Sequence, residues 1–207
     1  MKSLTVIGLF LLLAGSALAQ TSDLLISEYV EGSGDNQALE IYNGTADAVN
    51  LAGYAIDRYA NGAATPSASV LLPDINLPSG DVFVVVNSLA DATLLAMADM
   101  TDAELVFSGN DALVLSYGGQ PIDSIGRIGE DPGSYWGCDD GTTQNHTLIR
   151  LPSVCSGDAV IDDAFDPCLE WTFEAVDTFT SLGNHDDNCG SVPDEATSWG
   201  ALKATFR

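Results

Sequence analysis

The chain has 207 residues, and its 30 acidic and 6 basic side chains give a formal net charge of −24. Nucleic-acid binding draws its affinity from Lys and Arg side chains that displace condensed counterions, so this composition disfavours direct binding to DNA or RNA. The acidity instead fits a protein that stays dissolved outside the cell.

The first residues have the features of a cleavable export signal. Lys2 supplies a positive charge, residues 4–14 form an apolar stretch, and small residues end at Ala19, where a signal peptidase needs them. We expect cleavage after Ala19, so that the mature chain begins at Gln20 and is secreted or displayed on the cell surface. The stretch is shorter than the roughly 20 apolar residues of a spanning helix, and no later segment is longer, so we expect no membrane span.

The remaining chain reads as short strands separated by Gly, Asn, Asp and Pro residues. This pattern predicts an all-β fold of the sandwich type. One stretch, residues 89–100, is rich in Ala, Leu and Met and predicts a short helix that covers an open end of the sandwich. The predicted strands are 25–30, 39–43, 54–59, 82–87, 104–107, 112–117, 121–128 and 147–151.

Three landmarks open the mature chain, namely Ser27-Glu28-Tyr29, Glu40-Ile41-Tyr42-Asn43 and Leu51-Ala52-Gly53-Tyr54. Later motifs include Ser134-Tyr135-Trp136-Gly137 and Ser181-Leu182-Gly183-Asn184-His185. In this order they resemble the bacterial lamin-tail domain of the variant found on secreted extracellular nucleases, over about residues 22–186. The resemblance implies an immunoglobulin-like β-sandwich. Nucleases that carry this module have a separate, larger catalytic domain, which we do not expect in this chain.

We therefore expect a signal peptide over residues 1–19, a lamin-tail-like domain over residues 20–190 and a C-terminal tail over residues 191–207. In the tail, Trp199, Leu202 and Phe206 fall at helix-like spacing, which predicts a short amphipathic helix weakened by Gly200. The tail either packs on the domain as a last element or acts as a docking or sorting peptide.

Four cysteines lie in the C-terminal half of the mature chain, at positions 138, 155, 168 and 189. An even number of cysteines in an exported protein predicts disulfides, and no pair has the spacing of a zinc or redox site. Three connectivities are possible. We favour Cys138–Cys155 with Cys168–Cys189, because each bridge then closes one moderate loop, and together they would pin the C-terminal region.

Candidate catalytic residues are few. Glu28 and Glu40 should lie on neighbouring strands and resemble a paired-carboxylate site, but charged strand residues more often face water or accept backbone hydrogen bonds. His146 and His185 are the only histidines, and we expect both to bond to loops, because the chain has no Gly-x-Ser-x-Gly nucleophile turn. The sequence thus predicts no catalytic site and no enzyme activity.

Calcium binding is a more specific hypothesis than catalysis for the acidic residues. Calcium takes six to eight oxygen ligands, and Asp158, Asp162, Asp163 and Asp166 supply carboxylates within one acidic segment. No loop has the spacing of an EF-hand, and an acidic protein has acidic loops without any ion. We predict a calcium site at these four aspartates, and no other cofactor.

Two function classes compete. The first is a non-catalytic secreted binding or structural module that engages an extracellular protein, a polymer or a surface. The alternative is an accessory to extracellular nuclease activity, or a protein that binds DNA through bridging cations. The net charge favours the first.

Overall fold

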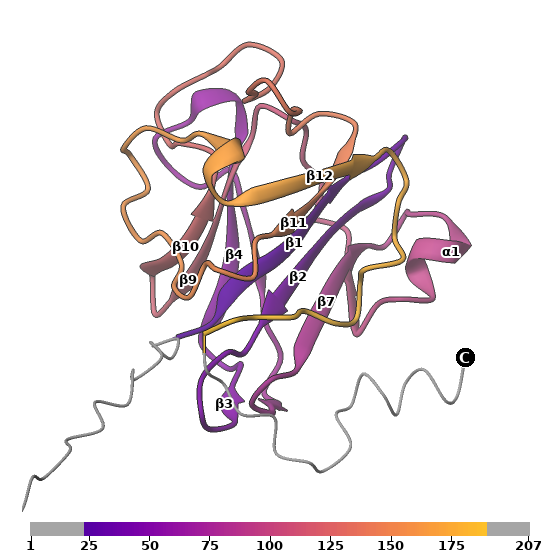
Figure 1. Cartoon of the computed structure of the whole chain (residues 1–207), viewed down its shortest axis with the longest axis vertical. Coiled ribbons are helices and arrows are strands. Elements are labelled where there is room, and N and C mark those ends of the chain that lie inside the picture. The colour runs from indigo at the N-terminus through magenta and orange to yellow at the C-terminus, as the bar shows by residue number, and fades with distance from the viewer. Residues whose placement is uncertain (1–22, 190–207) are drawn as a thin grey trace, which may run out of the picture.

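The computed structural model describes residues 23–189, which fold into two facing β-sheets (Figure 1). The predicted signal peptide and the predicted C-terminal tail lie outside these residues. Neighbouring strands of the larger sheet are antiparallel, except that β7 and β8 run parallel. In spatial order the larger sheet comprises β12 (Trp171–Ala175), β11 (His146–Arg150), β1 (Leu25–Glu31), β2 (Gln37–Tyr42), β7 (Val82–Asn87) and β8 (Met100–Asp102).

The smaller sheet is antiparallel, and a minor two-stranded ladder lies beside the two main sheets. The smaller sheet comprises β10 (Gln120–Ile125), β9 (Ala112–Tyr117), β4 (Tyr54–Tyr59) and β5 (Ala68–Leu71). The ladder pairs β3 (Val49–Asn50) with β6 (Asn76–Leu77). The helical turns are η1 (Ala60–Gly62), α1 (Ala92–Leu95) and η2 (Pro167–Leu169).

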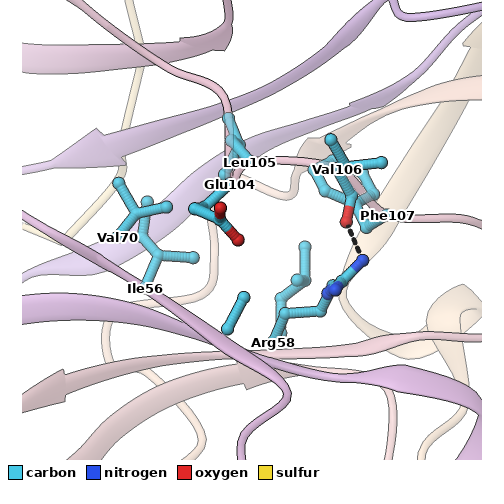
Figure 2. Close-up of a pocket in the computed structure, with 9 residues that line it drawn as sticks. Ile56, Arg58, Val70, Glu104, Leu105, Val106 and Phe107 are labelled. Carbon is cyan, nitrogen blue, oxygen red and sulfur yellow. Dashed lines mark hydrogen bonds between the residues drawn. The ribbon is translucent and has the colours of Figure 1, made fainter.

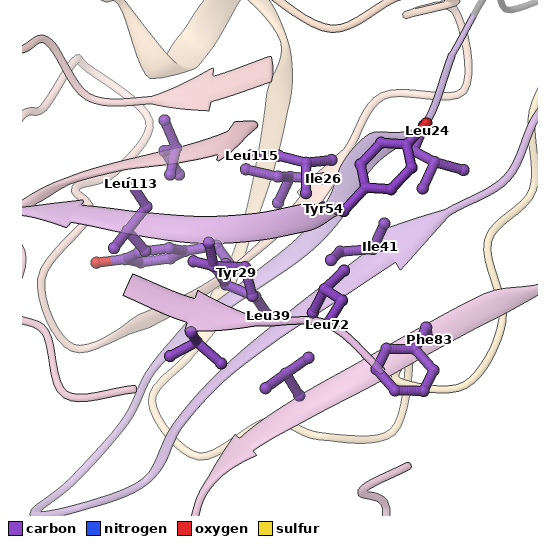
Figure 3. Packing of buried hydrophobic residues seen from close by; sticks show 14 of the residues in the cluster. Leu24, Ile26, Tyr29, Leu39, Ile41, Tyr54, Leu72, Phe83, Leu113 and Leu115 are labelled. Atoms are coloured by element: carbon purple, nitrogen blue, oxygen red, sulfur yellow. The ribbon is translucent and has the colours of Figure 1, made fainter. Parts of the chain in front are cut away.

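The main core fills the space between the two sheets, because strand side chains alternate between the faces and both sheets place apolar residues inward. Figure 3 shows Ile26, Leu39 and Ile41 of the larger sheet packed toward Leu113 and Leu115 of the smaller one. All five side chains are buried. The prediction of an immunoglobulin-like β-sandwich is confirmed.

Two element predictions were wrong. Residues 104–107 form no strand, although Leu105 and Phe107 are buried in the core. The predicted helix 89–100 shrinks to the four residues of α1, which begins at the capping residue Asp91 and must end before the chain returns to the sheet as β8. It packs through Leu94 on the outer face of the larger sheet beside β7, and not over an open end (Figure 1).

The predicted disulfide pairing was also wrong. The bridges are Cys138–Cys168 and Cys155–Cys189. Tertiary packing and not loop length selects them, because Trp136 packs edge-on against Phe165 at 5.9 Å between ring centroids and so draws together the segments around the first bridge. Both bridges nevertheless pin the C-terminal region.

A segment that we call the strap, residues 177–189, leaves β12 and crosses the outer face of the larger sheet (Figure 1). Its Phe179 and Leu182 pack on Val30 and Val84 in a second apolar cluster. Within residues 23–189, no helix has the length and apolar character needed to cross a membrane.

Candidate binding surfaces

Glu28 and Glu40, which we call the acid pair, lie directly opposite each other on β1 and β2. Of the two expectations for them, facing water was wrong, because their exposed fractions are only 1% and 0%, whereas Glu40 does accept a backbone hydrogen bond. The strap covers them. The hydroxyl of Ser181 donates to Glu28 Oε1 at 3.0 Å, and the backbone N–H of Gly183 donates to Glu40 Oε2 at 2.6 Å.

Burial raises the pKa of Glu28 to about 8, and the nearby Glu40 carboxylate adds to the rise. Glu40 is held further by the hydroxyl of Ser27, which donates to its Oε1 at 2.7 Å. A hydrolytic carboxylate pair must reach both a substrate and a water molecule. The acid pair has the strap above it, so its geometry fits a structural role in holding the strap.

The two histidines lie apart. His146 Nδ1 is 2.7 Å from the carbonyl oxygen of Gln144, a contact within its own loop, as predicted. His185 lies on the strap with its ring edge-on to Tyr42 at 4.9 Å between centroids, and burial lowers its pKa. It lines a cavity of about 370 Å³ between the strap and β11, together with Arg150, Ser181 and Asp186.

Two of the four aspartates predicted to bind calcium hold the backbone of their own segment. Asp158 Oδ1 accepts from the N–H of Val160, and Asp166 Oδ1 accepts from the N–H of Cys168 at the start of η2. In the part of the chain that the structure describes, the possible ligand atoms that gather in a group of three belong to Cys138, Asp166 and Cys168. Those cysteines are bonded to each other. The structure therefore does not bring Asp158, Asp162, Asp163 and Asp166 together, and the calcium site stays a prediction.

A buried polar centre that the sequence did not reveal joins β1, β10, β11 and the loop at Asp158. Asp123 on β10 and Arg150 on β11 are both essentially unexposed, and both oxygens of the carboxylate lie 3.2 Å from guanidinium nitrogens. The same carboxylate accepts from the backbone N–H groups of Ile26, Ser124 and Asp158. Arg150 also reaches Glu170 at 2.9 Å and lies over the ring of Trp171. Arg150 and Asp123 are 27 residues apart, so no local motif predicts this contact.

β5 is one of the two edge strands of the smaller sheet. The N–H of Leu72 donates to the carbonyl of Tyr54, which makes positions 54 and 72 a hydrogen-bonded pair. In an antiparallel ladder such pairs alternate, so Ala68 and Val70 bond to β4 while the backbone groups of Ser69 and Leu71 point away from it. The side chain of Leu71 is 71% exposed.

A shallow apolar groove lies beside this edge, between β5 and residues 104–107 (Figure 2). Ile56 and Val70 line one side, Leu105 and Phe107 line the other, and Val106 at the rim is 39% exposed. Arg58 spans the groove and donates through Nη1 to the carbonyl of Val106. The groove thus continues the apolar core out to the free edge.

The other sheet edges carry features that block strand addition. On β10, Pro121 lacks an N–H and the register shifts between Pro121 and Asp123. β8 has only three residues and ends in Asp102, and β12 carries Glu174. β5 reads Ala-Ser-Val-Leu, with neither a charge nor a proline. Among the edge strands of the two main sheets, β5 is the unprotected one.

The family model of the lamin tail domain matches residues 17–129. This is more than half of the chain. The chain belongs to the lamin tail domain family. No curated protein and no solved structure matches it. The family match includes all ten strands from β1 to β10, and therefore both the acid pair and the β5 edge.

Proposed function

We propose that this lamin tail domain protein is a non-catalytic extracellular binding module that takes an extended segment of a partner protein onto the free edge of β5. The observation that carries the proposal is the unprotected β5 edge beside an apolar groove. Ser69 and Leu71 offer backbone hydrogen bonds there, and the apolar lining beside the edge, which includes Val70 and Phe107, gives a surface that every second side chain of an added strand can contact.

The chemistry of the edge defines the partner. Within residues 23–189 the basic side chains are Arg58, Arg127 and Arg150, against 28 of the chain's acidic residues. An added strand should therefore carry apolar residues at alternate positions and Lys or Arg around them, because opposite charges steer association. Export, as the N-terminal sequence predicts, would place this surface outside the cell, where the two disulfides persist.

The test pans a library of extended peptides against the mature protein and measures the affinity of the selected peptides for three proteins. These are the unmodified chain, Leu71→Lys on the free edge, and the matched control Gln120→Lys on the protected edge of β10. Each variant adds one lysine to an exposed position of an edge strand of the same sheet.

We expect the selected peptides to alternate apolar residues and to lose at least about tenfold in affinity for Leu71→Lys, which places a charge on the free edge strand itself. Gln120→Lys should bind as the unmodified chain does. Equal affinities for all three proteins would show that the β5 edge is not the binding surface.

A further inference from the structure

The strap covers an apolar area on the outer face of the larger sheet. Val30, Ala38, Val84 and Val86 present side chains on this face, and each has an exposed fraction of 0%. Phe179 and Leu182 of the strap, with Leu94 of α1, pack against these side chains. An apolar patch of this kind stays out of water only while the strap lies on it.

Both ends of the strap are fixed independently of the acid pair. At its start, Asp177 accepts from the N–H of Ser33 at 2.9 Å, from the hydroxyl of Ser33 at 2.6 Å and from Asn36 at 3.0 Å. At its end, Cys189 is bonded to Cys155. Between these anchors, Ser181 and Gly183 contact the carboxyl groups of the acid pair.

The charged groups that act on Glu28 are all acidic. Glu40 faces it from β2, and Glu174 acts on it from β12. The strap itself brings a hydroxyl and a backbone N–H to the acid pair. Its titratable groups are Asp177 at the first anchor, His185 and Asp187, which contact Tyr42 further along, and Asp186 between them. An ionised Glu28 would therefore stand beside two carboxylates in a closed space, where the desolvation of its charge is only partly offset.

We propose that the middle of the strap, residues 178–188, is a pH-sensitive latch that lifts from the larger sheet when Glu28 loses its proton. Lifting admits water to the carboxylate and uncovers the apolar face. The anchors at Asp177 and Cys189 keep the lifted strap tethered, so closure on protonation is intramolecular.

The direction follows from proton linkage. With the strap closed, the pKa of Glu28 is about 8, whereas in the lifted state the carboxyl is hydrated and regains its ordinary value near 4.5. Between these values the closed state binds more protons than the lifted state does. Protonation of Glu28 therefore stabilises closure fully below pH 4.5 and progressively less as the pH rises. Each pH unit in this window should raise the opening constant about tenfold, and the rise should level off above pH 8.

The test measures amide hydrogen exchange of the full mature protein from pH 6 to pH 9, expressed as protection factors that remove the intrinsic pH dependence of exchange. The reporters are the amides of Leu182 and Gly183, which are bonded in the closed strap. The core amides of β7 report global unfolding. Glu28→Gln keeps a neutral oxygen that can accept from Ser181, and Glu104→Gln is the matched control at an exposed site.

In the unmodified chain and in Glu104→Gln, strap protection should fall about tenfold per pH unit up to pH 8 while the β7 amides stay protected. In Glu28→Gln, strap protection should be independent of pH. Protection that is flat in the unmodified chain, or that falls equally in Glu28→Gln, overturns the proposal. If Glu28→Gln does not fold, a carbon-13 titration of the Glu28 carboxyl in the unmodified chain decides. A midpoint below pH 6 would refute the latch. A midpoint near pH 8 that coincides with the loss of strap protection would support it.

Discussion

Replacing Asp123 by Asn removes one negative charge from the buried centre with little change in side-chain size. Oδ2 accepts from Ile26 N–H and from Arg150 Nη1, while Oδ1 accepts from Ser124 N–H, Asp158 N–H and Arg150 Nη2. An asparagine offers one oxygen and an N–H₂ group. Whichever way the amide turns, its donors face at least one backbone N–H and one guanidinium nitrogen.

The contacts of Asp123 determine how much free energy of unfolding the substitution should remove. Removing one partner of a buried ion pair costs about 3–5 kcal/mol, because the remaining charge is left uncompensated. Glu170 still contacts Arg150, but its side chain is 38% exposed, so it replaces only part of the lost partner. Each buried N–H left without an acceptor adds about 1–3 kcal/mol. We therefore expect a loss of about 4 kcal/mol, a large part of the 5–15 kcal/mol that is typical of a whole domain.

Urea unfolding with both disulfides intact measures this loss as a lower midpoint at an unchanged slope. Asp35→Asn, at an exposed turn position, is the matched control and should change stability by less than about 0.5 kcal/mol. Adding Arg150→Met to the Asp123→Asn variant should recover part of the loss, because it removes the unpaired cation. A loss below about 1 kcal/mol in Asp123→Asn would refute the view that this buried centre stabilises the fold by holding these segments together.

Three further measurements test the remaining predictions. The exported protein should begin at Gln20 and weigh four hydrogens less than its reduced form, and peptide mapping should recover Cys138 joined to Cys168 and Cys155 joined to Cys189; free thiols or other pairs would contradict this. If Asp158, Asp162, Asp163 and Asp166 bind calcium, millimolar calcium should raise Tm relative to chelator and magnesium should substitute poorly, whereas an unchanged melting curve removes the site. Deletion from Ser191 onward should leave Tm nearly unchanged but alter localisation or co-purifying partners. A drop of several kcal/mol in the free energy of unfolding would instead show that Trp199 and Phe206 complete the core.

Local pattern was enough to predict most of the strands. The strands at 54–59, 82–87 and 112–117 begin and end where they were predicted, because alternating or continuous apolar residues there are bounded by turn residues. β5 was missed because its four residues lie in a stretch rich in Ser, Pro and Gly. β12 was also missed, although its five residues, Trp171 to Ala175, alternate apolar and polar side chains as a half-buried strand does.

The features that define the candidate sites depend on contacts between residues far apart in sequence. The acid pair was predicted to lie on adjacent strands, and it does, but its burial is produced by Ser181 and Gly183, more than 140 residues away. The disulfide pairing failed for the same reason, because loop length ranks local closures and does not register the packing of Trp136 on Phe165. Sequence patterns locate strands, whereas burial of a charged strand residue depends on what covers it.

The segment after the family match completes the fold and is not a removable addition. The match ends at residue 129, and β11, β12, both disulfides and the strap all follow. β11 pairs along the edge of β1, so its loss would leave β1 as an open, apolar edge in the middle of the present sheet. The Arg150 to Asp123 contact ties this segment to the family portion through buried charge, and the strap covers the outer face. A truncated chain that ends at residue 129 should therefore aggregate or fail to fold, even though it contains every strand within the family match.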